Sequence, residues 1–480
     1  MSLKNKVLSG TRWVILANII RQLLVVGAMV VFARILSLDD FGAFAIVMMF
    51  STFLIMFSDM GTGAVLIHID EPSNILLSSL LYFNIFIGII LFLVLFISSA
   101  MIAHFFEIPI LEPLVKLLAF NFIILSFSIV QKALFQKKLE FKILATVETT
   151  ALFIGTVAGV TMAIEGFGVY SLVAQTLVTS IILTILLWVF SKWKPKMLFS
   201  LSEIKRIFKY TANLTAFNFV NYFAGNADYF LIGKFLGSSS LGVYSVAHRI
   251  MVFPLEQISQ TLIKVLFPAF SQIKHDNEKF KRAYLRVIFY ISLVTFPLMM
   301  GLVAVSEVFV SVVFGEKWSN LAIILTIMAP VGMLRSINTT LGSIYLAKGT
   351  TDTMFLIGSI GAFVTVTCIV VGIFFGVEGV AYALVVASAI MLYPNFSYAW
   401  VQIDLGVREG LSELFPVLVI SILMCLGVVL FDHFIGSYID SQPLRLAILI
   451  FTGVVIYIIL LRFRYNNLTV LLKELKKQKG

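Results

Sequence analysis

Long apolar stretches separated by short polar turns dominate the hydropathy pattern of this chain. A membrane-spanning helix needs about 20 mostly apolar residues, and fourteen stretches come close to or exceed that length. They are too long and too evenly apolar for the alternating strands of a β-barrel, so the pattern predicts an all-α polytopic membrane protein. The predicted spans are 13–36, 41–66, 75–103, 113–134, 143–165, 168–190, 208–234, 240–266, 285–313, 318–346, 352–375, 378–401, 413–433 and 444–462.

The composition supports a chain that is solvated mainly by lipid. Hydrophobic residues make up 60% of the chain and charged residues 12%, whereas about 25% of the residues of soluble domains are charged. Cys368 and Cys425 both lie within apolar stretches and are interpreted as small hydrophobic side chains. The sequence contains no P-loop, zinc-protease or serine-hydrolase motif, and no predicted outer loop is long enough for a catalytic domain. These observations exclude ATP-driven pumps and membrane enzymes such as polymerases or ligases.

The basic residues indicate the orientation of the chain in the membrane. If both termini are cytoplasmic, 26 Lys and Arg residues fall on the cytoplasmic side of the predicted spans and five on the outer side. This asymmetry obeys the positive-inside rule and accounts for the net charge of +10 without a nucleic-acid partner. The basic segment 268–286 is interpreted either as an ordinary cytoplasmic loop or as an amphipathic segment that lies on anionic headgroups.

Two segments that lie 200 residues apart repeat one pattern. Residues 33–46 read ARILSLDDFGAFAI, and residues 233–246 read GKFLGSSSLGVYSV. The shift of 200 pairs Thr11 with Thr211, Asn18 with Asn218, Arg34 with Lys234, Leu36 with Leu236, Gly42 with Gly242 and Phe44 with Tyr244. Because each segment is an outer turn between two predicted helices, we interpret spans 1–6 and 7–12 as two copies of one six-helix bundle.

The repeat predicts the domain organisation. Six spans are an even number, so both copies enter the membrane from the same side, as in transporters with parallel repeats. We expect one lobe over 1–200, a second over 201–412, and two additional helices with a basic cytoplasmic tail over 413–480. In transporters of this kind the substrate site lies between the halves near the membrane midplane.

Polar side chains within the spans follow helical stripes. Such residues are costly in a membrane and normally face a cavity or a partner. Candidates for an anion- and sugar-binding cavity are Asn18, Arg21, Asn218, Asn221, Arg249, Gln260, Lys264, Arg335 and Asn338, and candidates for binding a coupling ion are Asp228, Glu256 and Glu148. The alternative is a set of internal ion pairs, such as Arg249 with Glu256, that only hold helices together. Asp59 is interpreted as a structural partner of a basic loop and His248 as a hydrogen-bonded packing residue.

Four segments resemble one known family. They are ARILSLDDFGAFAIV, DMGTGAVLI, QKALFQKKLEFKILATVE and FPAFSQIKHDNEKFKRAYLR. They look like the bacterial polysaccharide exporters, which include Wzx-type lipid-linked oligosaccharide flippases and exporters of lipopolysaccharide or teichuronic acid in the MATE-like superfamily of multidrug, oligosaccharidyl-lipid and polysaccharide transporters. The likeness extends over nearly the whole chain.

The resemblance implies a function. Members of this family export an undecaprenyl-pyrophosphate-linked glycan across the bacterial cytoplasmic membrane by alternating access, commonly with a proton or sodium gradient and without an organic cofactor. Membrane lipid and other membrane proteins of polysaccharide assembly are the expected partners. The alternative within transporters is a MATE-type drug antiporter, which would need a cavity dominated by acids, whereas the arginines within the spans favour an anion.

The predicted topology can be tested by cysteine labelling. Cysteines introduced at Ser238 and Ser437 are expected to react with a membrane-impermeant thiol reagent in intact cells, because both positions fall on the outer side. A cysteine at Ser271 should react only after the cells are lysed. Labelling of position 271 from outside would contradict the fourteen-span arrangement.

Overall fold

The computed structural model describes most of the chain. The described residues are 3–59, 62–63, 66, 69, 72–204, 222 and 225–464. Within these ranges the side chains of 3–12, 15, 59, 256–269 and 437 are not described. Every regular element in the described part is a helix, which confirms the all-α prediction.

The described chain divides into two units, 1–242 and 243–480. The helices of the first unit are α1 (Leu3–Ile35), α2 (Leu38–Asp59), α4 (Asn74–Phe106), α5 (Leu111–Ser126), α6 (Ile129–Lys137), α7 (Phe141–Ile164) and α8 (Tyr170–Phe190). Helix α10 (Gly237–Gln272) begins in the first unit and continues into the second. The second unit then contains α11 (Asn277–Val313), α12 (Ser319–Lys348), α13 (Thr351–Ile373), α14 (Gly376–Trp400), α15 (Val407–Ile435) and α16 (Gln442–Arg464). Short 3₁₀ helices cover Glu316–Trp318, Val401–Ile403 and Gly436–Tyr438.

Most of the predicted spans correspond to helices of membrane-spanning length. In the described residues eleven helices are long and apolar enough to cross a membrane, or twelve if the bent pair α5 and α6 counts as one span. The two remaining predicted spans, 208–234 and 240–266, lie partly outside what the structure describes, so the count of fourteen stays a prediction. The same holds for the lobe boundaries predicted from the repeat.

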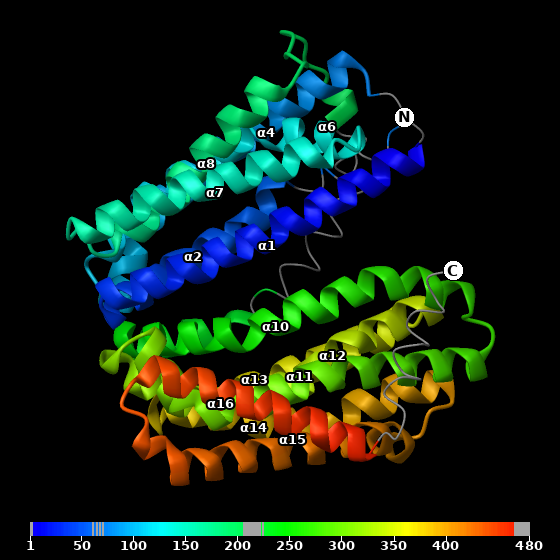
Figure 1. The fold of residues 1–480 in the computed structure, drawn as a ribbon. Coiled ribbons are helices and arrows are strands. Elements are labelled where there is room, and N and C mark those ends of the chain that lie inside the picture. Colours follow the sequence, from blue (N-terminus) through cyan, green and yellow to red (C-terminus); the bar gives the residue numbers. More distant parts are fainter. Residues whose placement is uncertain are drawn as a thin grey trace. The chain divides into compact units, whose positions relative to one another are not determined.

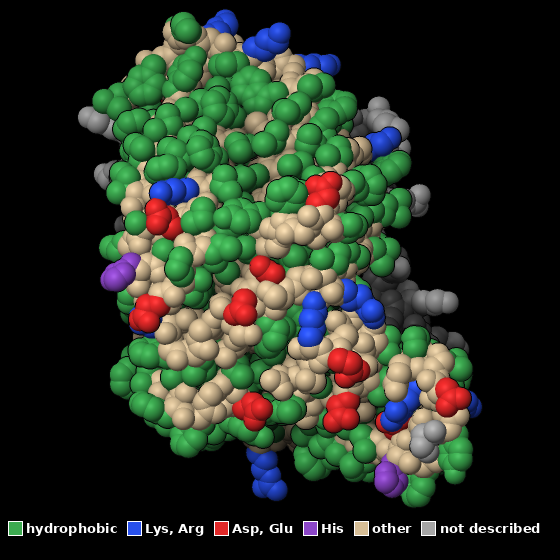
Figure 2. Space-filling model, turned by 90° about the vertical axis from the view of Figure 1, so that its left-hand side faces the viewer, with side chains coloured by type: hydrophobic (Ala, Val, Ile, Leu, Met, Phe, Trp, Pro, Cys, Tyr) green, Lys and Arg blue, Asp and Glu red, His purple; other side chains and the backbone are tan. Residues whose placement is uncertain are grey.

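The surface fits a lipid environment. Figure 2 looks onto the helix ends that lie on the left in Figure 1, where acidic and basic side chains lie among hydrophobic ones. The flanks of the helices carry the exposed apolar side chains. Helix α13 is the extreme case, because only 11% of its most apolar window is buried inside the protein. Phe355 and Phe363 on this helix are 55% and 74% exposed, which in a membrane is contact with acyl chains rather than with water.

Close backbone contact joins the helices of the first unit. Helices α7 and α8 lie side by side in the chain-coloured ribbon (Figure 1). A Cβ added to Gly155 would lie 2.0 Å from the hydroxyl oxygen of Thr179, and one added to Gly159 would lie 2.7 Å from the Cβ of Gln175. Small residues spaced four apart let membrane helices approach closely, and dispersion then holds them together.

The two repeated turns contact each other. A Cβ on Gly42 would lie 1.8 Å from the carbonyl oxygen of Ser238, and one on Gly242 would lie 2.1 Å from the carbonyl oxygen of Leu38. Leu38 and Ser238 are themselves 200 positions apart, so the contact is reciprocal under the shift that relates the repeats. Asp39 reinforces it by accepting a hydrogen bond from the hydroxyl of Ser238.

The start of α2 is fixed by side chains from the first of these turns. The hydroxyl of Ser37 receives a hydrogen bond from the N–H of Asp40 (3.1 Å), and the Asp40 carboxylate accepts from the N–H of Ser37 (2.9 Å). The other carboxylate oxygen of Asp40 accepts from the N–H of Val169 (3.0 Å). This reciprocal capping therefore also ties the α7–α8 connection to the start of α2.

The basic segment 268–286 is mostly helical rather than an ordinary loop. Helix α10 continues to Gln272 and α11 begins at Asn277, so the connection between them covers only 273–276. Phe280 and Tyr284 are fully buried, and the phenol of Tyr284 receives a hydrogen bond from Trp400 (3.2 Å). These aromatic residues face the protein, whereas Lys274, Lys279 and Arg282 are exposed, and their contact with anionic headgroups stays a prediction.

Helices α15 and α16 pack on the second unit. Val428 of α15 and Leu449 of α16 join Val305 and Val308 of α11 in one buried cluster. The carboxylate of Asp432 also accepts two hydrogen bonds from Arg445, of 2.7 and 2.8 Å. This bidentate pair links α15 to α16 near the turn between them.

The reciprocal glycine contact can be tested by adding a single methyl group. Gly42→Ala places a Cβ against the carbonyl of Ser238 and should destabilise the protein by about 1–3 kcal/mol, as overpacking does. The expected result is a lower Tm of the purified protein in detergent. Gly27→Ala is the matched control, because a Cβ at Gly27 meets nothing within 4 Å. Equal melting of the two variants would contradict the contact.

Candidate functional site

A break between α5 and α6 shapes the candidate site of the first unit. The two helices meet at an angle of 42° around Phe127 and Ser128. A break inside a membrane frees carbonyl groups that must find donors within the protein. Here Thr184 and Trp188 of α8 donate to the carbonyls of Ile124 (3.2 Å) and Phe127 (2.9 Å), and the hydroxyl of Ser128 donates to Leu125 (2.7 Å).

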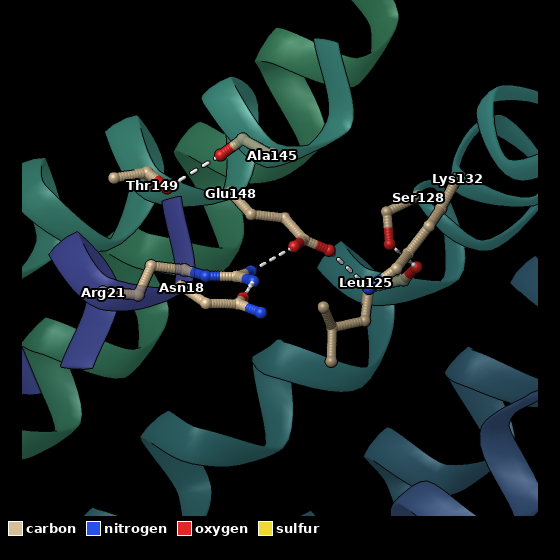
Figure 3. Close-up of polar contacts among 8 residues, drawn as sticks. All are labelled: Asn18, Arg21, Leu125, Ser128, Lys132, Ala145, Glu148 and Thr149. Carbon is tan, nitrogen blue, oxygen red and sulfur yellow. Dashed lines mark hydrogen bonds and ion pairs between the residues drawn. The ribbon is translucent and has the colours of Figure 1, made fainter. Parts of the chain in front are cut away.

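The broken helix brings Lys132 to a carboxylate on α7. The ammonium nitrogen of Lys132 lies 2.9 Å from Oε1 of Glu148. The other oxygen of Glu148 accepts a hydrogen bond from Arg21 of α1, and Arg21 also donates to Asn18 one turn earlier. Figure 3 shows these side chains converging from three helices on one carboxylate. We call Asn18, Arg21, Lys132 and Glu148 the α1–α6–α7 charge cluster.

The charge cluster carries one excess positive charge. Each oxygen of the single carboxylate faces one cation, so the formal sum of Arg21, Lys132 and Glu148 is +1. The side chains of Arg21, Glu148 and Lys132 are 28%, 20% and 41% exposed, so all three are partly accessible. Two cations on one carboxylate form a cradle for an anion, because guanidinium and ammonium groups bind a phosphate oxygen as they bind a carboxylate oxygen.

Three residues of this cluster were predicted from the sequence, and they lie together in the structure. Arg21 and Asn18 were expected to face a substrate and Glu148 to bind a coupling ion, and the structure joins them by direct hydrogen bonds. Lys132 is the residue that the sequence analysis missed: it was counted among the 26 cytoplasmic basic residues, although it lies near the end of the predicted span 113–134. The structure places it on α6. Ser126 and Ser128, which interrupt an apolar stretch, were the available signal for the break.

The second unit contains a candidate cation that is hydrogen bonded to a histidine. Arg335 of α12 lies with its guanidinium 3.1 Å from Nε2 of His248 on α10. A guanidinium has no acceptor, so it donates and this ring nitrogen carries no proton. The ring of Tyr244 stacks on His248 with 6.1 Å between centroids. His248 is thus hydrogen bonded and packed, as expected from the sequence.

Other predicted residues of the second unit have no common partner in the described part. Arg249 is exposed on α10, one position after His248. Asn338 lies one turn beyond Arg335, and its buried side-chain oxygen has no hydrogen-bond partner among the described residues. The structure therefore joins Arg335 to His248 and leaves the roles of Arg249 and Asn338 as predictions.

Several candidates fall outside the described residues. Asn218 and Asn221 belong to the part of the chain that the structure does not describe. The same holds for the side chains of Asp59, Glu256, Gln260 and Lys264. Asp228 is described: it is 7% exposed, and its carboxylate accepts a hydrogen bond from the N–H of Tyr229 (2.9 Å).

Charged pairs at the helix ends have a structural character. Lys234 donates to Glu107 (2.8 Å), which directly follows α4, and this hydrogen bond and the charge of Lys234 hold the pKa of Glu107 below its usual value. Asp276 caps α11 by accepting from the N–H of Lys279 (3.0 Å), and this backbone hydrogen bond lowers the pKa of Asp276. Among the described residues no group of three or more His, Cys, Asp or Glu is placed to hold a metal ion.

Comparison with known protein families agrees with the resemblance that the sequence segments show. The family model described as "polysaccharide biosynthesis protein" matches residues 31–323. The lipopolysaccharide biosynthesis protein WzxC of Escherichia coli (strain K12) is 31% identical to the chain over 374 residues, which are 78% of this chain and 76% of WzxC. The teichuronic acid biosynthesis protein TuaB of Bacillus subtilis (strain 168) is 32% identical over 358 residues, which are 74% of each protein.

Solved structures give the fold. The lipid II flippase MurJ in an inward closed conformation aligns with a TM-score of 0.77 at 16% identity, over 95% of this chain and 99% of that structure. An inward-facing multidrug resistance MATE family transporter of the MOP superfamily aligns with a TM-score of 0.64 at 14% identity, over 81% of this chain and 96% of that structure. The chain therefore has a MurJ-like and MATE-like fold.

Proposed function

The chain belongs to the family of polysaccharide biosynthesis proteins, and from this premise we propose that it carries an undecaprenyl-pyrophosphate-linked glycan across the bacterial cytoplasmic membrane. The protein is a multi-pass membrane transporter rather than an enzyme. The glycan is taken from the cytoplasmic side and released outside by alternating access. The prenyl tail stays in lipid during the passage, so the protein has to accommodate only the diphosphate and the sugars.

The proposal rests on one observation: Arg21 and Lys132 each contact one oxygen of the Glu148 carboxylate. A diphosphate must shed water to cross about 30 Å of hydrocarbon, and an isolated charge there is very costly. Two partly accessible cations can replace that water. Arg21 offers a planar set of donors for phosphate, and the neighbouring amide of Asn18 offers donors and an acceptor for sugar hydroxyls.

The same carboxylate gives the proposal its coupling step. In the described state Glu148 occupies the donors that a diphosphate would use, so the two anions compete for Arg21 and Lys132. In the outward-open state Glu148 binds a proton or a sodium ion from outside as the substrate leaves. In the inward-open state Arg21 and Lys132 draw the carboxylate back into the ion pair, which expels the ion into the cytoplasm, so the ion moves inward while the glycan moves outward. Asp228 and Glu256 remain further candidates for carrying the ion.

The second unit carries candidate cations of its own. Arg335 is exposed and hydrogen bonded to His248, and Arg249, which directly follows His248 on α10, is also exposed. We propose that both meet the anionic part of the substrate during the cycle and that Asn338 contributes an acceptor for sugar hydroxyls. Gln260, Lys264, Asn218 and Asn221 keep their predicted substrate-facing roles.

The repeat and the span count are part of the proposal. Two six-helix copies over 1–200 and 201–412, followed by two further helices, would give fourteen spans with both termini in the cytoplasm. The contacts of Gly42 and Gly242 support this repeat. Gly42 meets Ser238 and Gly242 meets Leu38, so a shift of 200 residues turns each contact into the other. Other membrane proteins of polysaccharide assembly are the proposed partners.

The alternative of a drug antiporter has less support. An organic cation would be attracted by a site with excess negative charge, whereas the charge cluster has a formal charge of +1. The described residues of the cluster therefore select for an anion.

Removal of Arg21 should impair export specifically. Arg21→Ala loses a charge-assisted contact worth roughly 1.5–3 kcal/mol, which corresponds to about ten- to a hundredfold slower export. Arg21→Lys should restore only part of it, because lysine lacks the planar fork. The measurement is surface polysaccharide in cells, normalised to the amount of protein in the membrane. Lys116→Ala is the control, since Lys116 forms its ion pair with Glu112 one turn away on α5 at a partly exposed position, and its loss should leave export intact. Normal export by Arg21→Ala would overturn the assignment of this cation.

Neutralisation of Glu148 distinguishes coupling from a static ion pair. Glu148→Gln keeps the shape but cannot release a proton, so gradient-driven transport in reconstituted vesicles should be lost while binding of the lipid-linked glycan is retained or strengthened. A purely structural pair would instead lower the Tm and reduce binding together with transport. Wild-type transport that ignores imposed proton and sodium gradients would refute the coupling step altogether.

A further inference from the structure

A chain segment without helical structure leaves α8 and runs along the beginning of α4. This segment, residues 191–200, is attached by four hydrogen bonds to side chains of α4. The N–H groups of Lys196 and Ser200 donate to the hydroxyls of Ser78 (3.0 Å) and Ser79 (2.8 Å). The phenol of Tyr82 donates to the carbonyl of Lys196 (3.1 Å), and the indole of Trp193 donates to Asn74 (3.2 Å). We call residues 191–200 the α8 strap.

The strap presents three lysines on one side. Successive side chains of an extended chain point in opposite directions. In agreement with this, Lys192, Lys194 and Lys196 are exposed, whereas the residues between them are partly buried. Trp193 packs against the buried cluster that includes Leu77 and Leu80 of α4. The inner side of the strap thus holds it to the protein, and the outer side is basic.

The three ammonium groups are available to an external anion. None of them forms an ion pair with a residue that the structure describes, in contrast to Lys279 and Lys281, which lie 3.0 Å and 2.7 Å from the carboxylates of Asp276 and Glu409. Three like charges on alternate positions of a docked strap repel one another, and an anion beside them relieves this repulsion.

Exposed apolar side chains follow directly after the lysines. Met197 is 99% exposed, Phe199 is 58% exposed and Leu201 is 55% exposed. Apolar side chains this open to water would cost free energy. The strap follows the end of α8 and lies along the beginning of α4, and both helices are of membrane-spanning length. A segment at the ends of such helices is expected near the level where the acyl chains begin. Basic residues beside apolar ones at this level are typical of segments that bind an anionic bilayer surface.

We propose that the α8 strap is a docking surface for anionic phospholipids of the cytoplasmic leaflet. Lys192, Lys194 and Lys196 bind headgroup phosphates, and Met197 and Phe199 enter the upper acyl region. Because the strap is bound to α4 and continuous with α8, this contact sets the depth of both helices in the membrane. The inference does not depend on which molecule the protein transports.

The test uses the full-length protein with a fluorescent reporter at the most exposed position. Met197→Cys in a background of Cys368→Ala and Cys425→Ala is labelled with an environment-sensitive fluorophore. The protein is reconstituted into vesicles of phosphatidylcholine alone or of phosphatidylcholine and phosphatidylglycerol at about 3:1, which supplies the surface charge that polybasic segments recognise. The measurement is quenching by lipids that carry a nitroxide near the headgroup end of the acyl chain.

The expected result is stronger quenching in the vesicles that contain phosphatidylglycerol. Lys192→Gln with Lys194→Gln should reduce this quenching to the level seen in phosphatidylcholine. The matched control, Lys279→Gln with Lys281→Gln, removes the same charge from paired lysines and should leave quenching unchanged. Quenching that is absent in both vesicles would place the strap in water and overturn the proposal. Equal quenching in both vesicles, unaffected by the lysine substitutions, would overturn the role of anionic lipid.

Discussion

The described structure depends on one constraint: polar groups in hydrocarbon must find their partners within the protein. The break between α5 and α6 shows how the constraint is met. Three carbonyls around Phe127 and Ser128 receive hydrogen bonds from side chains of α8 and from Ser128 itself. A carbonyl left without any donor in hydrocarbon would cost several kcal/mol. The break in turn allows Lys132 to reach the carboxylate of Glu148. The geometry of the charge cluster therefore depends on the hydrogen bonds that the carbonyls at the break receive.

The same constraint separates two kinds of charge in this protein. Arg445 and Asp432 form a closed bidentate pair that satisfies both partners. Glu148, in contrast, is divided between two cations, and each of these cations keeps donors that the single carboxylate does not use. A closed pair holds helices together, whereas a cluster with an excess cation can exchange its anion. This difference in charge balance is the reason why we propose a transport role for the charge cluster and not for the pair of Arg445 and Asp432.

Close packing through glycine complements these polar contacts. Apolar burial hardly drives helices together in lipid, so association relies on van der Waals contact between closely spaced backbones. Gly155 and Gly159 provide such contact between α7 and α8, and Gly42 and Gly242 provide it between the two repeated turns. A side chain at any of these positions would push the backbones apart, and α7 carries both Glu148 and the glycines that fix its position.

The amino-acid sequence determined the properties that depend on local composition. The length of the apolar stretches predicted a helical membrane protein, and the similarity of two segments 200 residues apart predicted a repeat. The structure brings the two turns of this repeat into contact. The sequence also nominated Arg21 and Glu148, because charged residues within a span are rare. Only the tertiary structure decided that these two residues bind each other across 127 positions of the chain and share their contact with Lys132. It likewise decided that Phe270, Phe280 and Tyr284 are buried in the second unit. Hydropathy reports where a residue lies along its own helix, whereas the rotation and register of packed helices depend on long-range contacts that no local pattern encodes.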